Sequence, residues 1–148
     1  MFKKILVPTD GSEPSERAGE YAISVADLNS ADIILLNVIN TDYLDALPQK
    51  DLSEKIDEGL REEAKEIVEK FKKKIEDEKC NGNCKNINWI SLIRPGKPED
   101  VILEVAEDEN VDQIIMGKSG KNAIERFLLG STAERVVREA NVTVNVII

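Results

Sequence analysis

The chain contains no histidine among its 148 residues. Catalytic triads, general bases and metal sites that depend on an imidazole are therefore excluded, as are histidine pH switches. Cysteine is nearly as scarce, because the chain has only Cys80 and Cys84, in the stretch CNGNC. Two thiols cannot complete a four-ligand zinc site without help. Free surface thiols, a disulfide across the Asn-Gly turn and a metal shared between subunits are the interpretations left open for this pair.

Long apolar runs are missing as well. The longest are IILL and VII, far shorter than the roughly 20 residues that a membrane-spanning helix needs. The N-terminal stretch MFKKILVPTD has too few apolar residues for a signal peptide, so we expect a cytoplasmic protein that does not associate with membranes. Acidic residues outnumber basic ones by 29 to 20, and the net charge of −9 argues against unspecific binding to nucleic acid or anionic lipid. A local site for one small anion is compatible with this charge.

Apolar segments alternate with amphipathic ones along the whole chain. Short apolar runs predict strands at 3–9, 31–40, 86–94, 111–117 and 142–148. Segments with helical periodicity lie between them. The order predicts one α/β domain over residues 1–148, with a single open five-stranded parallel sheet and helices on both faces. A ligand crevice is expected at the carboxyl ends of the strands, where the strand order reverses.

The predicted helices carry apolar residues at spacings of three or four. Ser12 suits the N-cap of the first helix, and Pro98 lies near the start of the third. The Lys and Glu residues on the outer face of the second helix are expected to be solvated. The four predicted stripes are Ala18, Tyr21, Ala22, Val25 and Ala26; Leu52, Ile56, Leu60, Ala64, Ile67, Val68, Phe71 and Ile75; Val101, Ile102, Val105 and Ala106; and Ala133, Val136, Val137 and Ala140.

The stretch MGKSGKNAIERFLLGST, residues 116–132, contains a Gly-Lys-Ser tripeptide. It is not a P-loop, because G-x-x-x-x-G-K-[ST] needs a glycine at position 112, which is Asp112, and the intervening QIIM is β-prone. Gly117 and Gly120 are expected to turn the backbone with positive φ and to let a ligand approach closely. The last helix is expected to begin after Gly130, with an N-cap at position 131 or 132.

This loop can bind an anion without being a P-loop. A helix N-terminus with unpaired N–H groups and small residues attracts anions, and Lys118 and Lys121 would add positive charge. If the first and fourth strands are neighbours, Asp10 faces Gly117 across one crevice. The alternative, that the glycines only shape turns, is weaker for three glycines placed between a strand and a helix.

The spacing Gly117-x2-Gly120-x9-Gly130-Ser131 matches G-x2-G-x9-G-[ST], and with it the chain resembles the ATP-binding universal stress proteins. The resemblance covers the whole chain, from ILVPTDGSEPSERA to FLLGSTAERV. It implies an adenine nucleotide alpha hydrolase-like fold with strand order 3-2-1-4-5. The chain departs from the family pattern in two places: Ser119 stands where His is frequent, and no proline precedes the last strand.

The resemblance also implies an ATP site. Pro8 and Val38 would border the adenine, and the Val38 backbone would read its edge. Asp10 would hold the ribose, or a Mg²⁺ or Mn²⁺ ion near the phosphates. Met116 and Gly117 would lie near the middle of the nucleotide. Gly120, Gly130, Ser131 and Thr132 would contact phosphate. The full set of expected ATP contacts is Pro8, Thr9, Asp10, Val38, Met116, Gly117, Gly120, Gly130, Ser131 and Thr132.

Several functions compete on this basis. The first is a nucleotide-dependent regulatory module of the stress response, read by an unidentified protein partner. The alternatives are a slow or partner-stimulated ATPase and a nucleotide-free dimeric interaction module. Fast intrinsic hydrolysis is not expected, because Asp10 is the only acid at the pocket and no histidine is available. A phospho-acceptor domain is disfavoured because the third strand ends in Arg94-Pro95, and a flavin site because TDGSEPS is a poor phosphate loop.

The last predicted strand, VTVNVII, is β-branched and carries no proline, lysine or charge between Val142 and Ile148. An exposed apolar edge of this kind invites pairing with another chain. Antiparallel pairing with its own copy satisfies the free backbone groups, and the two-fold symmetry stops further growth. We therefore expect a homodimer joined through this strand, and the family resemblance points the same way.

Overall fold

A computed structural model describes residues 2–41, 50–80, 87–118 and 129–148. The strands and helices within these ranges alternate along the chain, as the sequence predicts. Their ends differ slightly from the predicted ones. In chain order they are β1 (Lys4–Pro8), α1 (Glu13–Asn29), β2 (Asp32–Ile39), α2 (Lys50–Cys80), β3 (Trp89–Pro95), α3 (Pro98–Asp108), β4 (Gln113–Gly117), α4 (Ser131–Glu139) and β5 (Thr143–Ile147).

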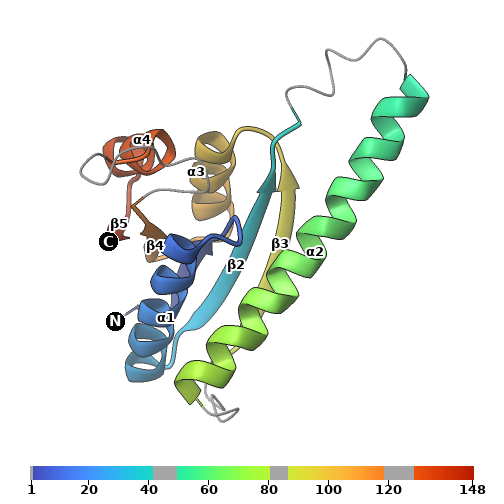
Figure 1. Cartoon of the computed structure of the whole chain (residues 1–148). Helices are drawn as coiled ribbons and strands as arrows, with labels where there is room; N and C mark the ends of the chain where they lie inside the picture. The colour runs from blue at the N-terminus through green and yellow to red at the C-terminus, as the bar shows by residue number, and fades with distance from the viewer. Residues whose placement is uncertain (1, 42–49, 81–86, 119–128) are drawn as a thin grey trace.

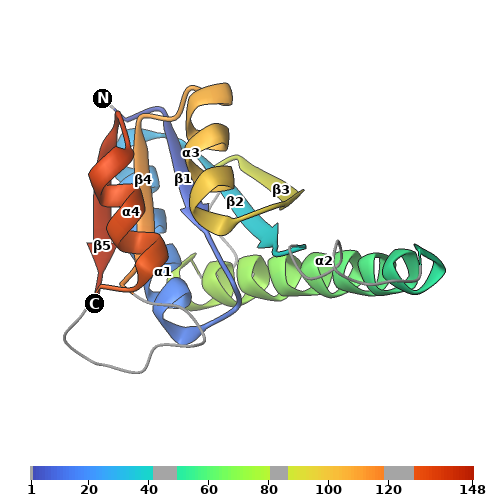
Figure 2. The same ribbon diagram turned by 90° about the horizontal axis from the view of Figure 1, so that it is seen from above.

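The strands form one five-stranded sheet with the order β3-β2-β1-β4-β5. Each neighbouring pair is parallel. Helices α1 and α2 cover one face, and α3 and α4 cover the other (Figures 1 and 2). The predicted fold class and strand order are thus confirmed. The order reverses between β1 and β4, because the chain first builds outward from β1 to β3 and then returns to the other side of β1.

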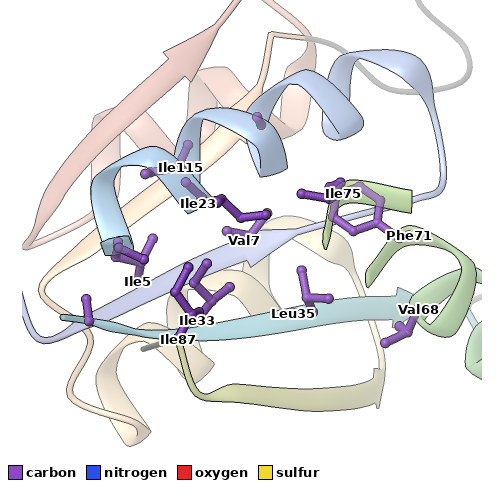
Figure 3. Close-up of a cluster of buried hydrophobic side chains, with 14 residues drawn as sticks. Ile5, Val7, Ile23, Ile33, Leu35, Val68, Phe71, Ile75, Ile87 and Ile115 are labelled. Carbon is purple, nitrogen blue, oxygen red and sulfur yellow. The ribbon is translucent and has the colours of Figure 1, made fainter. Parts of the chain in front are cut away.

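The face under α1 and α2 contains the larger part of the core (Figure 3). Side chains alternate between the faces of a strand, so Ile5 and Val7 point to this face, whereas Leu6 points to the other. Burial of each large aliphatic side chain stabilises the fold by about 1.5–3 kcal/mol. The buried residues that α1 and α2 contribute are Ala18, Ala22, Ile23, Ala26, Val68, Phe71 and Ile75.

Helices α1 and α2 cross closely at Gly19. A Cβ atom built there would overlap Ile75 Cδ1 and lie 2.7 Å from Phe71 Cζ. Because α1 is covered by α2 as well as by the sheet, its buried face extends to Gly19 and Ile23. The predicted stripe is therefore wrong at Tyr21, whose residue surface is 44% exposed.

Helices α3 and α4 pack side by side on the opposite face. Arg135 of α4 forms an ion pair with Asp100 of α3 at 2.7 Å and with Glu99 at 3.6 Å. Ala133 and Val136 are buried as predicted, but Val137 is 46% exposed, so the predicted stripe of α4 is wrong at this residue. The helix is short, and only one narrow side of it reaches the sheet.

Helix α2 is longer than the sheet that it covers. Its 31 residues span about 46 Å at 1.5 Å per residue, whereas the 8 residues of β2 span about 26 Å. Among the α2 side chains that the structure describes, the buried ones run from Ala64 to Ile75, and the predicted Leu52 lies outside the described side chains. The N-terminal half projects beyond the carboxyl ends of the strands (Figures 1 and 2), and Ile56 and Leu60 are half-buried there.

Candidate functional site

The two central strands separate toward their carboxyl ends. The last paired position of β1 and β4 is Leu6–Ile114, whereas β1 and β2 remain paired as far as Pro8–Leu36. The end of β1 and the end of β4 are therefore not joined by a ladder, and a crevice is expected between strands at such a point. Met116 lies beyond the last pair and is buried in the core under α3 and α4.

The turn after β1 is held by its own side chains. Thr9 is buried, and its Oγ1 accepts a hydrogen bond from the Gly11 N–H at 3.1 Å and lies 3.1 Å from Ser15 Oγ. Asp10 Oδ1 accepts a hydrogen bond from the Ser12 N–H at 2.9 Å. The Thr9 hydroxyl thus stabilises the turn, and one carboxylate oxygen of Asp10 is fixed at the carboxyl end of β1.

Gly11 gives this turn its shape. Its φ is +80°, a conformation that side-chain-bearing residues rarely adopt. A Cβ atom at Gly11 would lie 3.2 Å from Ile67 Cγ2 of α2. The turn that follows β1 therefore rests directly on the long helix. Ser12 is the N-cap of α1, as predicted, although its side chain makes no capping hydrogen bond.

Gly117, at the end of β4, is required for close approach rather than for an unusual backbone angle. Among the described glycines only Gly11 and Gly96 have positive φ, so the expectation of positive φ at Gly117 is wrong. A Cβ atom at Gly117 would lie 2.8 Å from the carbonyl carbon and oxygen of Pro14. The first turn of α1 thus packs directly on the end of β4, without space for a side chain between them.

Helix α4 begins at Ser131, and its N-cap is Gly130. The predicted N-cap at Ser131 or Thr132 is therefore wrong by one or two positions. Gly130 has a φ of −59°, so its small size, and not its conformational freedom, distinguishes it here. Its N–H donates to the Lys118 carbonyl at 2.9 Å, and the Lys118 N–H donates to the Ile147 carbonyl at 2.9 Å. These two bonds bring the start of α4 next to the end of β4.

The predicted loop residues Ser119, Gly120 and Lys121 lie outside the described residues, as does the turn between Cys80 and Cys84. Nothing in the described part of the chain tests the role expected of Gly120. The bonds at Lys118 nevertheless fix where this loop leaves β4 and where it joins α4. The loop that carries the glycine signature therefore begins and ends beside the carboxyl end of β4.

Three described helices begin at the carboxyl end of the sheet, and they differ in charge. The first turn of α1 contains Glu13 and Glu16, and that of α3 contains Glu99 and Asp100. Acidic residues there stabilise a helix but repel an incoming anion. The first turn of α4 contains only Glu134 and otherwise consists of small residues. Of these three helix starts, α4 is the one suited to an anion.

Asn37 and Val38 of β2 lie beside the point where β1 ends. Asn37 is 6% exposed, and its Nδ2 donates to the Thr9 carbonyl at 2.9 Å. Val38 is half-buried. The Leu36 carbonyl accepts the Thr9 N–H at 2.8 Å, and backbone groups alternate in direction along a strand, so the Val38 N–H and C=O also point toward β1. Because β1 has ended at this level, the β1–β2 ladder does not include Val38.

The described residues do not by themselves form a complete set of metal ligands. In the part of the chain that the structure describes, no group of three or more Cys, Asp and Glu side chains is placed to hold one. Mg²⁺ accepts carboxylate, phosphate and water oxygens, so Asp10 together with a bound polyphosphate fits its preferences.

The described helices include none that is long and apolar enough to cross a membrane.

Comparison with known proteins places the whole chain in one family. The sequence model of the universal stress protein family matches residues 1–147. The chain belongs to this family. Universal stress protein MJ0531 of Methanocaldococcus jannaschii is 36% identical over 147 residues, which cover 99% of this chain and 82% of that protein. MJ0577 of the same organism is also 36% identical, and the match covers 99% and 95% of the two chains.

Solved structures of universal stress proteins share this fold. The structure of MJ0577 superposes with a TM-score of 0.85 and covers 99% of this chain and 96% of that one. A universal stress protein in complex with cAMP is 21% identical, with a TM-score of 0.65 and coverage of 99% and 97%. The Archaeoglobus fulgidus protein in complex with dAMP is 19% identical, with a TM-score of 0.68 and coverage of 100% and 98%. At these two identities the likeness shows the fold alone.

The predicted site residues within the described chain lie at the ends of β1, β2 and β4 and at the start of α4. Thr9 lies there too, but its hydroxyl is engaged by the Gly11 N–H and the Ser15 hydroxyl within the turn. Sequence reasoning overlooked Asn37, Ser15 and Ile67. The polar Asn37 inside the apolar run IILLNVI was a usable signal, because a buried amide needs a partner. Ile67 was predicted only as part of the apolar stripe of the second helix, and no local signal indicated its contact with Gly11.

Proposed function

We propose that this universal stress protein binds ATP and acts as a nucleotide-dependent regulatory module in the stress response. The observation that carries the proposal is the start of α4. Small residues follow Gly130 at this helix start, and Gly130 is hydrogen-bonded to the end of β4 through Lys118. The β- and γ-phosphates would bind at this helix start. Ser131 and Thr132 supply hydroxyl donors, and Gly120 completes the loop.

The adenine would lie at the other end of the crevice, beside Pro8 and Val38. The Val38 backbone presents a donor and an acceptor on the same side of β2, and adenine offers the complementary pair at N1 and N6. The family members solved with cAMP and dAMP both hold adenine nucleotides, which supports this choice of base. Met116 and Gly117, at the end of β4, would lie under the middle of the nucleotide.

Asp10 would act through a divalent cation. Its carboxylate is held at the end of β1 by the Ser12 N–H, between the expected positions of base and phosphates. Mg²⁺ or Mn²⁺ would be coordinated by this carboxylate and by phosphate oxygens. Rapid hydrolysis is not part of the proposal, because a general base is needed and the chain has no histidine.

A homodimer through β5 would present this module to an unidentified protein partner. β5 is an edge strand of the sheet. Both α1 and α4 pack against it, and each carries a large exposed apolar residue, Tyr21 at 44% and Val137 at 46%. Antiparallel pairing of two β5 strands would satisfy the unpaired backbone N–H and C=O groups of this edge. Tyr21 and Val137 would extend the interface on both faces of the sheet.

Calorimetric titration with MgATP tests the proposal. We expect binding by the parent protein and none by Gly130→Val, because the branched side chain would occupy the space of the phosphates. Gly59→Val is the matched control, since a Cβ atom at Gly59 has no neighbour within 4 Å. It should bind as the parent does. No heat and no rise in melting temperature with millimolar ATP in the parent would contradict the proposed function.

A further inference from the structure

Asn37 changes the hydrogen bonding between β1 and β2 at the point where β1 ends. The backbone ladder between them runs from Lys4–Asp32 to Pro8–Leu36. The last bond of this ladder is donated by the Thr9 N–H to the Leu36 carbonyl, at 2.8 Å. The next bond of a regular parallel ladder would run from the Val38 N–H to the Thr9 carbonyl.

That next bond is replaced by a side chain. The Thr9 carbonyl accepts a hydrogen bond from Asn37 Nδ2 at 2.9 Å, and the ladder of paired positions does not include Thr9 and Asn37. The amide is buried, with 6% of the residue exposed, so water competes poorly for the bond. The described backbone hydrogen bonds include none from the Val38 N–H to the Thr9 carbonyl, so the Asn37 amide stands in the place of that bond.

We infer that Asn37 is a positioning residue that keeps the Val38 N–H available to a nucleobase and thereby sets the preference for adenine. The inference rests on the proposed function, because it concerns the base of the bound nucleotide. Asn37 itself lies behind the Thr9 carbonyl and need not touch the ligand. Its effect is to stop the β1–β2 ladder one step early, so that Val38 presents its backbone donor and acceptor to the crevice.

The expected selectivity follows from the order of donor and acceptor. Adenine has an acceptor at N1 and a donor at N6, which match the Val38 N–H and C=O. Hypoxanthine has a donor at N1 and an acceptor at O6, so each of its groups meets a backbone group of the same kind. The two bases have nearly the same shape and stacking surface. ATP and ITP thus differ mainly at the edge that Val38 would read.

The test compares the parent with Asn37→Leu, which has nearly the same volume and lacks the donor. In this variant we expect the Val38 N–H to bond the Thr9 carbonyl. Affinity for ATP should fall by about tenfold, the worth of one good hydrogen bond, while affinity for ITP and for inorganic tripolyphosphate stays within about twofold. Asn37→Ala is the second variant, in case the leucine disturbs folding. Asn29→Leu is the matched control, because Asn29 also donates to a backbone carbonyl, that of Val25, at 2.8 Å.

Amide hydrogen exchange at Val38, measured by NMR without nucleotide, gives a readout that does not depend on binding. Exchange should be fast in the parent and in Asn29→Leu, and slow in Asn37→Leu. Equal exchange at Val38 in parent and Asn37→Leu would overturn the inference, as would an unchanged ratio of ATP to ITP affinity. If the parent binds neither nucleotide, the proposed function fails, and slow exchange confined to the Asn37 variant would still support the role of Asn37 in ending the ladder.

Discussion

Replacement of Gly117 by alanine should push the first turn of α1 away from the end of β4. The new Cβ atom would lie 2.8 Å from the Pro14 carbonyl group, against 3.4 Å at the lower end of ordinary contact, so the first turn of α1 must retreat by about 0.6 Å. The obstacle is backbone, which cannot rotate away. Overpacking of this kind costs about 1–3 kcal/mol of unfolding free energy. Since α1 begins at the turn that holds Asp10, ATP affinity should fall as well.

Gly59→Ala is the same chemical change at a position without neighbours within 4 Å. It lies inside α2, where alanine stabilises a helix by about 0.8–1 kcal/mol relative to glycine. The two variants should therefore shift stability in opposite directions. Urea unfolding followed by circular dichroism and by Trp89 fluorescence measures both. A Gly117→Ala protein as stable as the parent, with unchanged ATP affinity, would refute the close packing of α1 on β4.

Three further changes test other parts of the structure. Asp10→Asn should weaken ATP binding more with Mg²⁺ than without it if the carboxylate acts through the ion, and calorimetry in Mg²⁺ and in EDTA compares the two; equal losses would indicate a ribose contact instead. The N–H groups of Lys3 and Lys4 hold the pKa of Asp112 below its ordinary value of 3.8, so the stability it contributes is present above about pH 4 and is lost as the pH falls through the lowered pKa. Asp112→Ala should thus cost less than about 1 kcal/mol at pH 7, because the carboxylate is exposed, and still less at pH 3; urea midpoints that differ more at pH 3 would contradict this. Val144→Lys should turn the expected dimer into a monomer in sedimentation equilibrium, and a dimeric variant would place the interface away from β5.

The arrangement of the sheet could be predicted because its signals are local. Apolar runs such as IILL and the alternation of strand and helix periodicity define a parallel sheet, and the family resemblance supplied its order. Residues whose burial depends on a third element were predicted less well. Tyr21 has the right spacing for the stripe of α1, but α2 packs on the other flank, at Gly19. Spacing within one helix cannot reveal that second contact.

The same limit applies to the candidate site. Asp10, Gly117 and Gly130 could be located from their places after strands and before a helix, which is where topology gathers ligand contacts. The physical reason why glycine is needed at each of these positions could not be predicted. Gly117 meets the backbone of Pro14, far from it in sequence, and its φ is ordinary. Asn37 could be recognised as polar, but its acceptor lies on a different strand.

The unequal lengths of α2 and the sheet imply that the stability of this helix is not uniform. Isolated helices of fewer than about 12–15 residues are marginal in water, so the projecting half depends on its continuation into the packed half. From Ala64 onward, opening α2 exposes Phe71 and Ile75 and so approaches global unfolding. Before Ala64, opening exposes little buried surface. Residues 54–63 should therefore open and be cleaved by proteases through local fluctuations, while the proposed nucleotide site remains folded.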